Sequence, residues 1–200
     1  YDAKGLMATA LSSNDPVVFF ESQRLYDQVE TFQPEGVPAD YYRVPFGVPD
    51  IKRAGDDVTI LTIGPSLYSA LKAADDLADL GLEAEVIDAR TLVPFDYDAV
   101  LASVKKTGHL LVVSEASERG SFAMTVASTV TRFGFESLKA PPRVLGCPNW
   151  IVPGADMEST YFPQAHDIVD VVTADFFPAK KSNMRGVRTW NDLDLARAAL

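Results

Sequence analysis

Short apolar runs alternate with segments of helical periodicity through the middle of this chain, and this alternation limits its fold more than any other feature. Each run is too short for a helix and rich in β-branched residues, which is typical of a strand buried on both faces. The runs are VTILTI at 58–63, AEVID at 84–88, HLLVVSE at 109–115 and PRVLG at 142–146. Because short links and amphipathic segments join them, we predict an α/β fold of three layers, with helices flanking a mainly parallel sheet. We expect the strands to lie side by side in chain order.

Capping residues mark the ends of the predicted helices. Asp96 and Ser121 each stand directly before a helical segment, where a short polar side chain accepts hydrogen bonds from the first turn. Gly108 follows a helical segment and is expected to end it, since glycine adopts the left-handed conformation at little cost. A closing helix is expected within 163–177.

The ends of the chain do not share this pattern. We divide the chain into residues 1–26, a linker at 27–49, the α/β domain at 50–178 and a polar tail at 179–200. VVFFE at 17–21 has the composition of a strand, although the later domain offers it no obvious partner. We therefore expect this strand to need cover from another surface or chain.

Composition excludes several classes of protein. The net charge of −10 over 200 residues disfavours nucleic-acid binding, which needs clustered Lys and Arg, and suits a basic protein partner. No apolar run approaches the ~20 residues of a membrane helix. Cys147 is the single cysteine, so the chain forms no internal disulfide. A lone cysteine and the absence of a signal-like start favour a cytoplasmic protein.

The segment VIDARTLVPFD at 86–96 places charged residues at the end of a predicted strand. Ligands of α/β proteins usually bind at that edge, so Asp88, Arg90 and Thr91 are candidates for a binding loop. The alternative, which we favour, is that Asp88 and Arg90 tie the loop to neighbouring turns while residues 92–94 pack beneath it. IGPS at 63–66 is interpreted as a tight turn, since one glycine without a following lysine does not make a phosphate-binding loop.

A second group of polar residues follows the third strand, in SEASERGSF at 114–122. Carboxylates beside an arginine could serve in general acid–base chemistry; we favour a joint between subunits. Trp150, in a loop between elements, is either an interface anchor or a lid on the core. His109 and His166 are expected at the surface or at helix caps. The candidates for an interface or a partner-docking surface are therefore Glu115, Glu118, Arg119, Phe122 and Trp150.

Several motifs, in this order, resemble a known family. They are YDAKGLMATAL with DPVVFFES, IKRAGDDVTILTIG, EVIDARTLVPFD, SVKKTGHLLVVSEA and TYFPQAHDIVDVV. Together they resemble the β-type part of the E1 component of thiamine-diphosphate-dependent 2-oxo acid dehydrogenases, such as the pyruvate and branched-chain enzymes. The similarity extends from residue 1 to about 178. Ser114 departs from the pattern, because many members of the family have histidine there.

The resemblance implies a fold, an activity and partners. The α/β domain would be a transketolase-type C-terminal domain, and residues 1–26 would be the last helix and strand of a pyrimidine-binding domain. The whole protein would decarboxylate a 2-oxo acid on thiamine diphosphate and Mg²⁺ and pass the acyl group to the lipoyl-bearing E2 partner. The family's catalytic glutamate and its diphosphate site would lie outside this chain, so no catalytic, cofactor or metal residue is assigned here and the chain alone should be inactive.

The resemblance also implies that this chain supports assembly. It would pair with a second copy of itself, with an α-type E1 half and with the subunit-binding domain of E2. Two alternatives stay open: the C-terminal domain of a transketolase or deoxyxylulose-phosphate synthase, and an assembly module without a cofactor.

Overall fold

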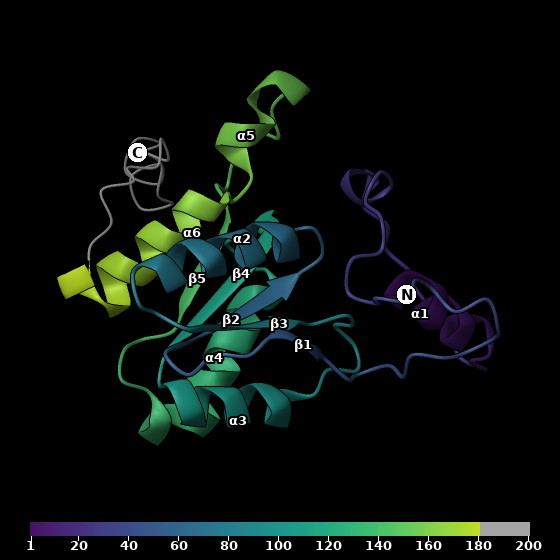
Figure 1. The fold of residues 1–200 in the computed structure, drawn as a ribbon, viewed down its shortest axis with the longest axis horizontal. Coiled ribbons are helices and arrows are strands. Elements are labelled where there is room, and N and C mark those ends of the chain that lie inside the picture. The colour runs from purple at the N-terminus through teal and green to yellow at the C-terminus, as the bar shows by residue number, and fades with distance from the viewer. Residues whose placement is uncertain (181–200) are drawn as a thin grey trace.

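A single sheet of five strands forms the centre of the computed structural model, which describes residues 1–180 (Figure 1). In chain order the strands are β1 Asp50–Arg53, β2 Val58–Ile63, β3 Ala84–Asp88, β4 Leu110–Ser117 and β5 Arg143–Cys147. β3, β2, β4 and β5 run parallel, and β1 pairs antiparallel with β3 at one edge. The predicted α/β class and parallel strands are confirmed. The predicted tail falls almost wholly outside the described residues.

The strand order differs from the prediction. The order is β1-β3-β2-β4-β5, so β2 lies between β3 and β4 and the expected sequential order is wrong. The chain crosses from β2 to β3 on one side of the sheet and returns over β2 to reach β4 on the other. This path places helices on both faces, which strands buried on both faces require. β1 was not predicted, because its polar, half-exposed residues are typical of an edge strand instead.

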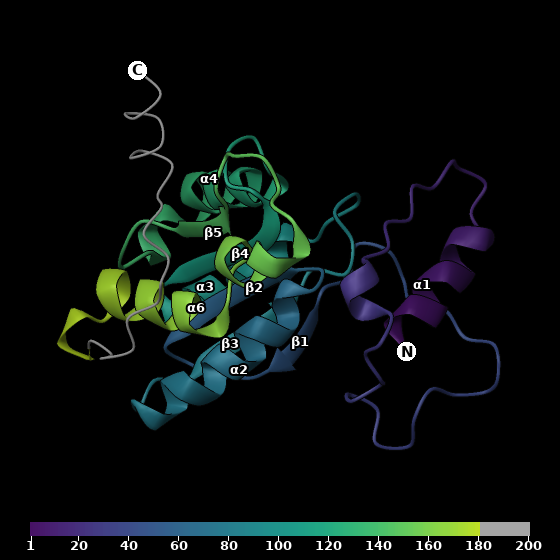
Figure 2. The same cartoon turned by 90° about the horizontal axis from the view of Figure 1, so that it is seen from above.

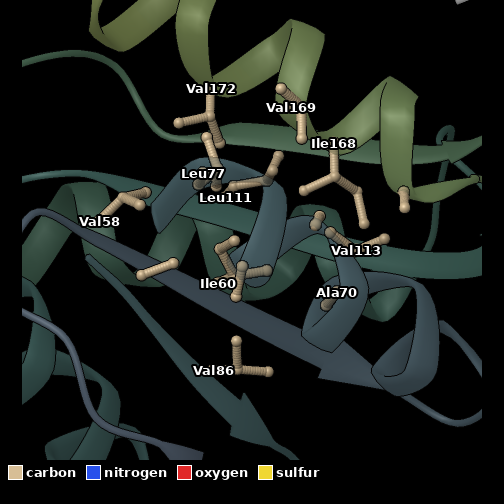
Figure 3. Close-up of a cluster of buried hydrophobic side chains, with 14 of the residues drawn as sticks. Val58, Ile60, Ala70, Leu77, Val86, Leu111, Val113, Ile168, Val169 and Val172 are labelled. Carbon is tan, nitrogen blue, oxygen red and sulfur yellow. The ribbon is translucent and has the colours of Figure 1, made fainter. Parts of the chain in front are cut away.

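Helices cover both faces of the sheet. α2 Ser66–Asp79 and α6 Ala165–Val171 lie on one face, and α3 Tyr97–Thr107 and α4 Phe122–Gly134 lie on the other (Figure 1). Successive residues of a strand point to opposite faces, so each central strand supplies both cores. In β4, for example, Leu111 and Val113 join the cluster under α2 and α6 (Figure 3), whereas Leu110 and Val112 join the cluster on the side of α3 and α4.

The predicted helix ends are confirmed by local hydrogen bonds. The Asp96 carboxylate accepts from the amides of Asp98 and Ala99, at 2.9 and 3.2 Å. The Ser121 hydroxyl accepts from the amide of Met124 at 3.4 Å. Gly108 ends α3 with a φ of 81°, in the left-handed region that favours glycine. These ends depend on residues close together in the sequence, which is why sequence patterns locate them.

The N-terminal segment lies beside the sheet and outside both of its layers (Figure 2). It contains α1 Asp2–Leu11 and a single turn, η1 Gln23–Leu25. Residues 17–21 form no strand within the described residues, and Val18 and Phe20 are 77% and 86% exposed. A strand needs a neighbour to pair with, and none lies beside this run. The assignment of residues 1–26 to a preceding domain stays a prediction.

The remaining elements are short and connect or extend the main ones. They are η2 Phe135–Ser137, η3 Ala155–Met157, α5 Glu158–Tyr161, η4 Val172–Phe176, which continues α6, and η5 Pro178–Lys180. None of the helices within residues 1–180 is both long and apolar enough to span a bilayer.

Val112→Asp is expected to destabilise the domain by about 4 kcal/mol or more, because it buries an unpaired charge in a strand covered on both faces. Val112 is 0% exposed, whereas Val93, in the β3–α3 loop, is 88% exposed and provides the control. Val93→Asp should change the free energy of unfolding by less than about 0.5 kcal/mol. Chemical denaturation measures both values, and equal stability of the two variants would contradict the placement of β4.

Candidate functional site

The carboxyl edge of the parallel strands is where an α/β sheet usually binds ligands, at the point where the strand order reverses. In this sheet the reversal lies between β2 and β4, because α2 leaves β2 on one face and α4 leaves β4 on the other. The turn at 64–66 follows β2, and residues 115–121 lie at the end of β4 and beyond it.

The turn after β2 is held by its own polar groups. The Ser66 hydroxyl donates to the carbonyls of Ile63 and Val113, at 2.9 and 3.0 Å, and is buried. Gly64 adopts a φ of 66°, which gives the tight turn expected for this segment. The side chain that could have faced a ligand therefore fixes the turn against β4.

Glu115, near the end of β4, is a partly buried carboxyl group at this edge. Its side chain is 18% exposed and pairs with the Arg24 guanidinium from the N-terminal segment. Burial raises the pKa of Glu115 above its ordinary range; Arg24 lowers it in part and Glu158 raises it further. The group is thus a carboxyl that takes up a proton more readily than a free one and that also anchors a cation.

Glu118, Arg119 and Phe122 have separate environments. The Glu118 carboxylate accepts from the amide of Gly146 at 3.2 Å, which ties the loop after β4 to β5. Arg119 is exposed. Phe122 points instead into the cluster beside α3 and α4, where its ring meets Phe95 edge-on at 5.4 Å between centroids. The structure therefore brings Glu115 and Glu118 to the same end of the sheet but packs the partly buried Phe122 against the core.

Trp150 lies on the surface. It is 65% exposed, and the side chains of Ile151, Val152 and Met157 beside it are also exposed. Asn149, Trp150 and Ile151 line a shallow, open hollow. The Tyr161 hydroxyl donates to the carbonyl of Trp150 at 3.1 Å and so supports the loop. The lid interpretation of Trp150 is wrong, while its role as an interface anchor stays a prediction.

The loop after β3 is tied to neighbouring segments by its polar residues. Arg90 Nη2 contacts Asp2 Oδ1 at 2.7 Å and Asp50 Oδ2 at 2.6 Å, and the amide of Arg90 donates to Asp88 at 3.1 Å. The Thr91 hydroxyl accepts from the amide of Gly47 at 2.8 Å. The structural interpretation of this loop is therefore confirmed, except that Val93 and Pro94 are exposed and do not pack beneath it.

Asp2, Asp50 and Lys52 take part in this arrangement, and sequence reasoning missed all three. They come from α1 and β1, far from Arg90 in the sequence. The sequence around Arg90 showed only that a positive charge stands at the end of a strand. That charge alone did not distinguish a residue that binds a ligand from one that pairs with other side chains.

The two histidines differ from each other. His109 is 7% exposed, packs against the rings of Phe176 and Phe177 and places Nδ1 3.0 Å from the carbonyl oxygen of Asp57. Its predicted surface position is wrong, because Phe176 at the end of η4 and Phe177 after it cover the ring. His166 lies in the first turn of α6, half-exposed, as expected. Within residues 1–180 no three His, Cys, Asp or Glu side chains are grouped so that they could hold a metal.

Comparison with known proteins gives a family match. A family model described as the transketolase C-terminal domain matches residues 47–168. The β subunit of acetoin:2,6-dichlorophenolindophenol oxidoreductase from Bacillus subtilis is 42% identical over 172 residues, covering 86% of this chain and 49% of the relative. The β subunit of the pyruvate dehydrogenase E1 component from the same organism is 40% identical over 170 residues, covering 85% and 51%.

A solved structure is similar as well. A split-gene transketolase, described as an inactive β4 tetramer, superposes with a TM-score of 0.57 at 28% identity, covering 73% of this chain and 47% of that one. The chain spans about half the length of the curated relatives it matches.

Glu115→Gln is expected to stabilise the protein at neutral pH, and this gain should shrink as the pH falls. Because the folded pKa of Glu115 is raised, the native state binds a proton that the unfolded state has lost, so stability declines as pH rises through the folded pKa. Below the ordinary pKa of 4.5 both states are protonated and the difference should vanish. Urea denaturation from about pH 4 to about pH 8 measures it.

Arg24→Gln provides the matched control for this experiment. It removes the cation that lowers the pKa of Glu115, so the pH dependence should become steeper than in the parent protein. A Glu115→Gln variant that is less stable than the parent by the same amount at every pH would show that the ion pair outweighs burial.

Proposed function

Since this chain belongs to the transketolase C-terminal domain family, we propose that it is the C-terminal domain of the β-type part of an E1 component. The whole protein would oxidatively decarboxylate a 2-oxo acid on thiamine diphosphate and transfer the acyl group to lipoyl-E2. The observation that carries this proposal is the similarity of 40% or more to β subunits of an acetoin oxidoreductase and of pyruvate dehydrogenase E1.

The proposed role of this domain is assembly and partner docking. Ser66, Glu118 and Arg90, three polar side chains at the usual ligand edge, are all engaged in holding turns and loops. Among residues 1–180 no three Asp, Glu, His or Cys side chains are grouped so that they could hold a metal ion.

We assign the joint between copies to the exposed loop that carries Trp150. Exposed aromatic and aliphatic side chains on one loop are typical of interface cores. A relative described as a β4 tetramer supports self-association of such chains. Glu115, Glu118 and Arg119 lie at the same end of the sheet. Besides a second copy and E2, the third partner of this chain would be an α-type E1 half.

Activity is tested on the complete β subunit containing this chain, purified with the α-type subunit. With thiamine diphosphate and Mg²⁺, substrate-dependent reduction of dichlorophenolindophenol is expected, and comparing pyruvate, branched-chain 2-oxo acids and acetoin identifies the substrate. The 200-residue chain alone should show no turnover. Dye reduction by the chain alone, or none by the complete assembly with any substrate, would contradict the proposal.

Transketolase is the second candidate, because the similar solved structure is a split-gene transketolase. Transfer of a two-carbon ketol unit between sugar phosphates by the complete assembly, without dye reduction, would favour it.

Association with the E2 subunit-binding domain should slow as salt rises. This chain has a net charge of −10, and we propose that it meets a basic surface on that domain. Complementary charge acts mainly on the association rate, and salt shortens the field to ~8 Å at physiological ionic strength. Stopped-flow measurements of the complete E1 at low and high NaCl give the rate. A rate that does not change with salt would mean that the acidic surface has no role in docking.

A further inference from the structure

The N-terminal segment contacts the carboxyl edge of the sheet through charges. Neither buried hydrophobic cluster of the domain includes any residue from 1–26. The segment is joined to the domain by Asp2, through its ion pairs with Lys52 and Arg90, and by Arg24, through its ion pair with Glu115. Figure 2 shows the segment beside the sheet, beyond the end from which the loop after β3 extends. The contacts that join the segment to the domain are therefore mainly ion pairs.

The first contact is a closed group of four charges, which we call the edge clamp: Asp2, Asp50, Lys52 and Arg90. Lys52 Nζ lies 2.8 Å from Asp2 Oδ2 and 2.7 Å from Asp50 Oδ2. Arg90 Nη2 contacts the same two acids at 2.7 and 2.6 Å. Each acid therefore bridges both cations, and the four charges sum to zero.

Burial makes the edge clamp sensitive to the loss of any member. The side chains of Lys52 and Arg90 are only 4% and 12% exposed. Burial alone would lower the pKa of Lys52, but the hydrogen bonds that its ammonium donates to Asp2 and Asp50 raise that pKa above its ordinary value, so the ammonium stays charged. Removing one partner from a buried pair leaves an uncompensated charge, which costs far more than the loss of a surface pair.

The loop that carries Arg90 is fixed from both sides. Arg90 has a φ of 54°, a conformation in which few residues other than glycine are found, and the Asp88 carboxylate holds its amide. The linker is bound to the same loop, because Gly47 donates to Thr91 at 2.8 Å and accepts from the amide of Asp96 at 3.0 Å. The backbone that carries the Arg90 guanidinium is thus held by contacts that do not involve α1.

The N-terminal segment is also a unit in its own right. The carbonyl of Gly5 accepts from the amide of Val44 at 3.1 Å, and the Thr9 hydroxyl donates to the Val44 carbonyl at 2.6 Å. Gly5 has no side chain where a Cβ would overlap Val44 and Tyr42. α1 and the end of the linker are therefore packed on each other, and the clamp attaches both together.

The second contact lies at the end of β4. The Arg24 guanidinium pairs with Glu115 and stands 5.0 Å from the centre of the Phe162 ring, at cation–π distance. The two contacts lie at separate points of the same edge: the edge clamp at the end of β3, and the Arg24–Glu115 pair at the end of β4. Two separated attachments limit rotation of a segment in a way that one cannot.

From this geometry we propose that the carboxyl edge of the sheet is a docking surface for the chain's own residues 1–26, and that the edge clamp sets their orientation relative to the domain. The partner of this edge is a chain segment that presents an aspartate and an arginine at the spacing of Asp2 and Arg24. This inference goes beyond the proposed E1 function and does not depend on which reaction the complete protein catalyses.

The distance between α1 and α4 tests the proposal in the 200-residue chain. Spin labels are attached at Leu11→Cys and Ser128→Cys, both exposed positions, in a Cys147→Ala background. Pulsed electron paramagnetic resonance then gives the distribution of distances between the two labels in the parent, in Arg90→Gln and in Arg53→Gln. Arg53 also pairs with two acids, Asp75 and Glu83, but both lie within the domain, so it is the matched control.

The distribution should become about twofold wider in Arg90→Gln and stay unchanged in Arg53→Gln, because only the first change releases the segment. Asp2→Asn disrupts the edge clamp at its one member that lies outside the domain, and it should widen the distance distribution as well. This variant tests the proposal if Arg90→Gln fails to fold. An unchanged distribution in Asp2→Asn, or equal widening in Arg53→Gln, would overturn the proposal.

Discussion

Burial of β2 and β4 on both faces is the constraint on which the rest of this structure depends. Their aliphatic side chains alternate between two hydrophobic clusters, so a core is needed above and below the sheet. That requirement sends α2 to one face and α3 and α4 to the other, and the chain must cross over β2 on its way from β3 to β4. The reversal of strand order, and with it the edge at which loops gather, follows from covering two strands from both sides.

Sequence reasoning found the parts of the fold that short-range interactions determine. The four parallel strands, the caps at Asp96 and Ser121 and the end at Gly108 each depend on residues within a few positions of one another. It missed β1 because an edge strand need not be apolar, and it misplaced His109 because Phe176 and Phe177, which cover it, are distant in the sequence. Strand order was missed for the same reason, since pairing between strands leaves no local pattern.

The candidate site shows the same division. The pattern in SEASERGSF placed Glu115 and Glu118 at a strand end, where the structure has them, but could not reveal that Phe122 turns into the core. The segment VIDARTLVPFD raised a choice between a ligand loop and a structural joint. Its answer needed Asp2 and Asp50, which only the folded chain brings to Arg90. A sequence shows which residues are charged, whereas the fold determines which of them pair with each other.

The edge clamp has a consequence for how this protein can change over generations. An apolar interface tolerates gradual drift, because one aliphatic side chain replaces another with little loss. Two largely buried cations that are neutralised by two partly buried acids do not, since a change at Asp2, Asp50, Lys52 or Arg90 leaves a charge without its partner until another changes with it. Homologous sequences should therefore vary at these four positions in concert, and the orientation of the N-terminal segment relative to the α/β domain would be inherited as one unit.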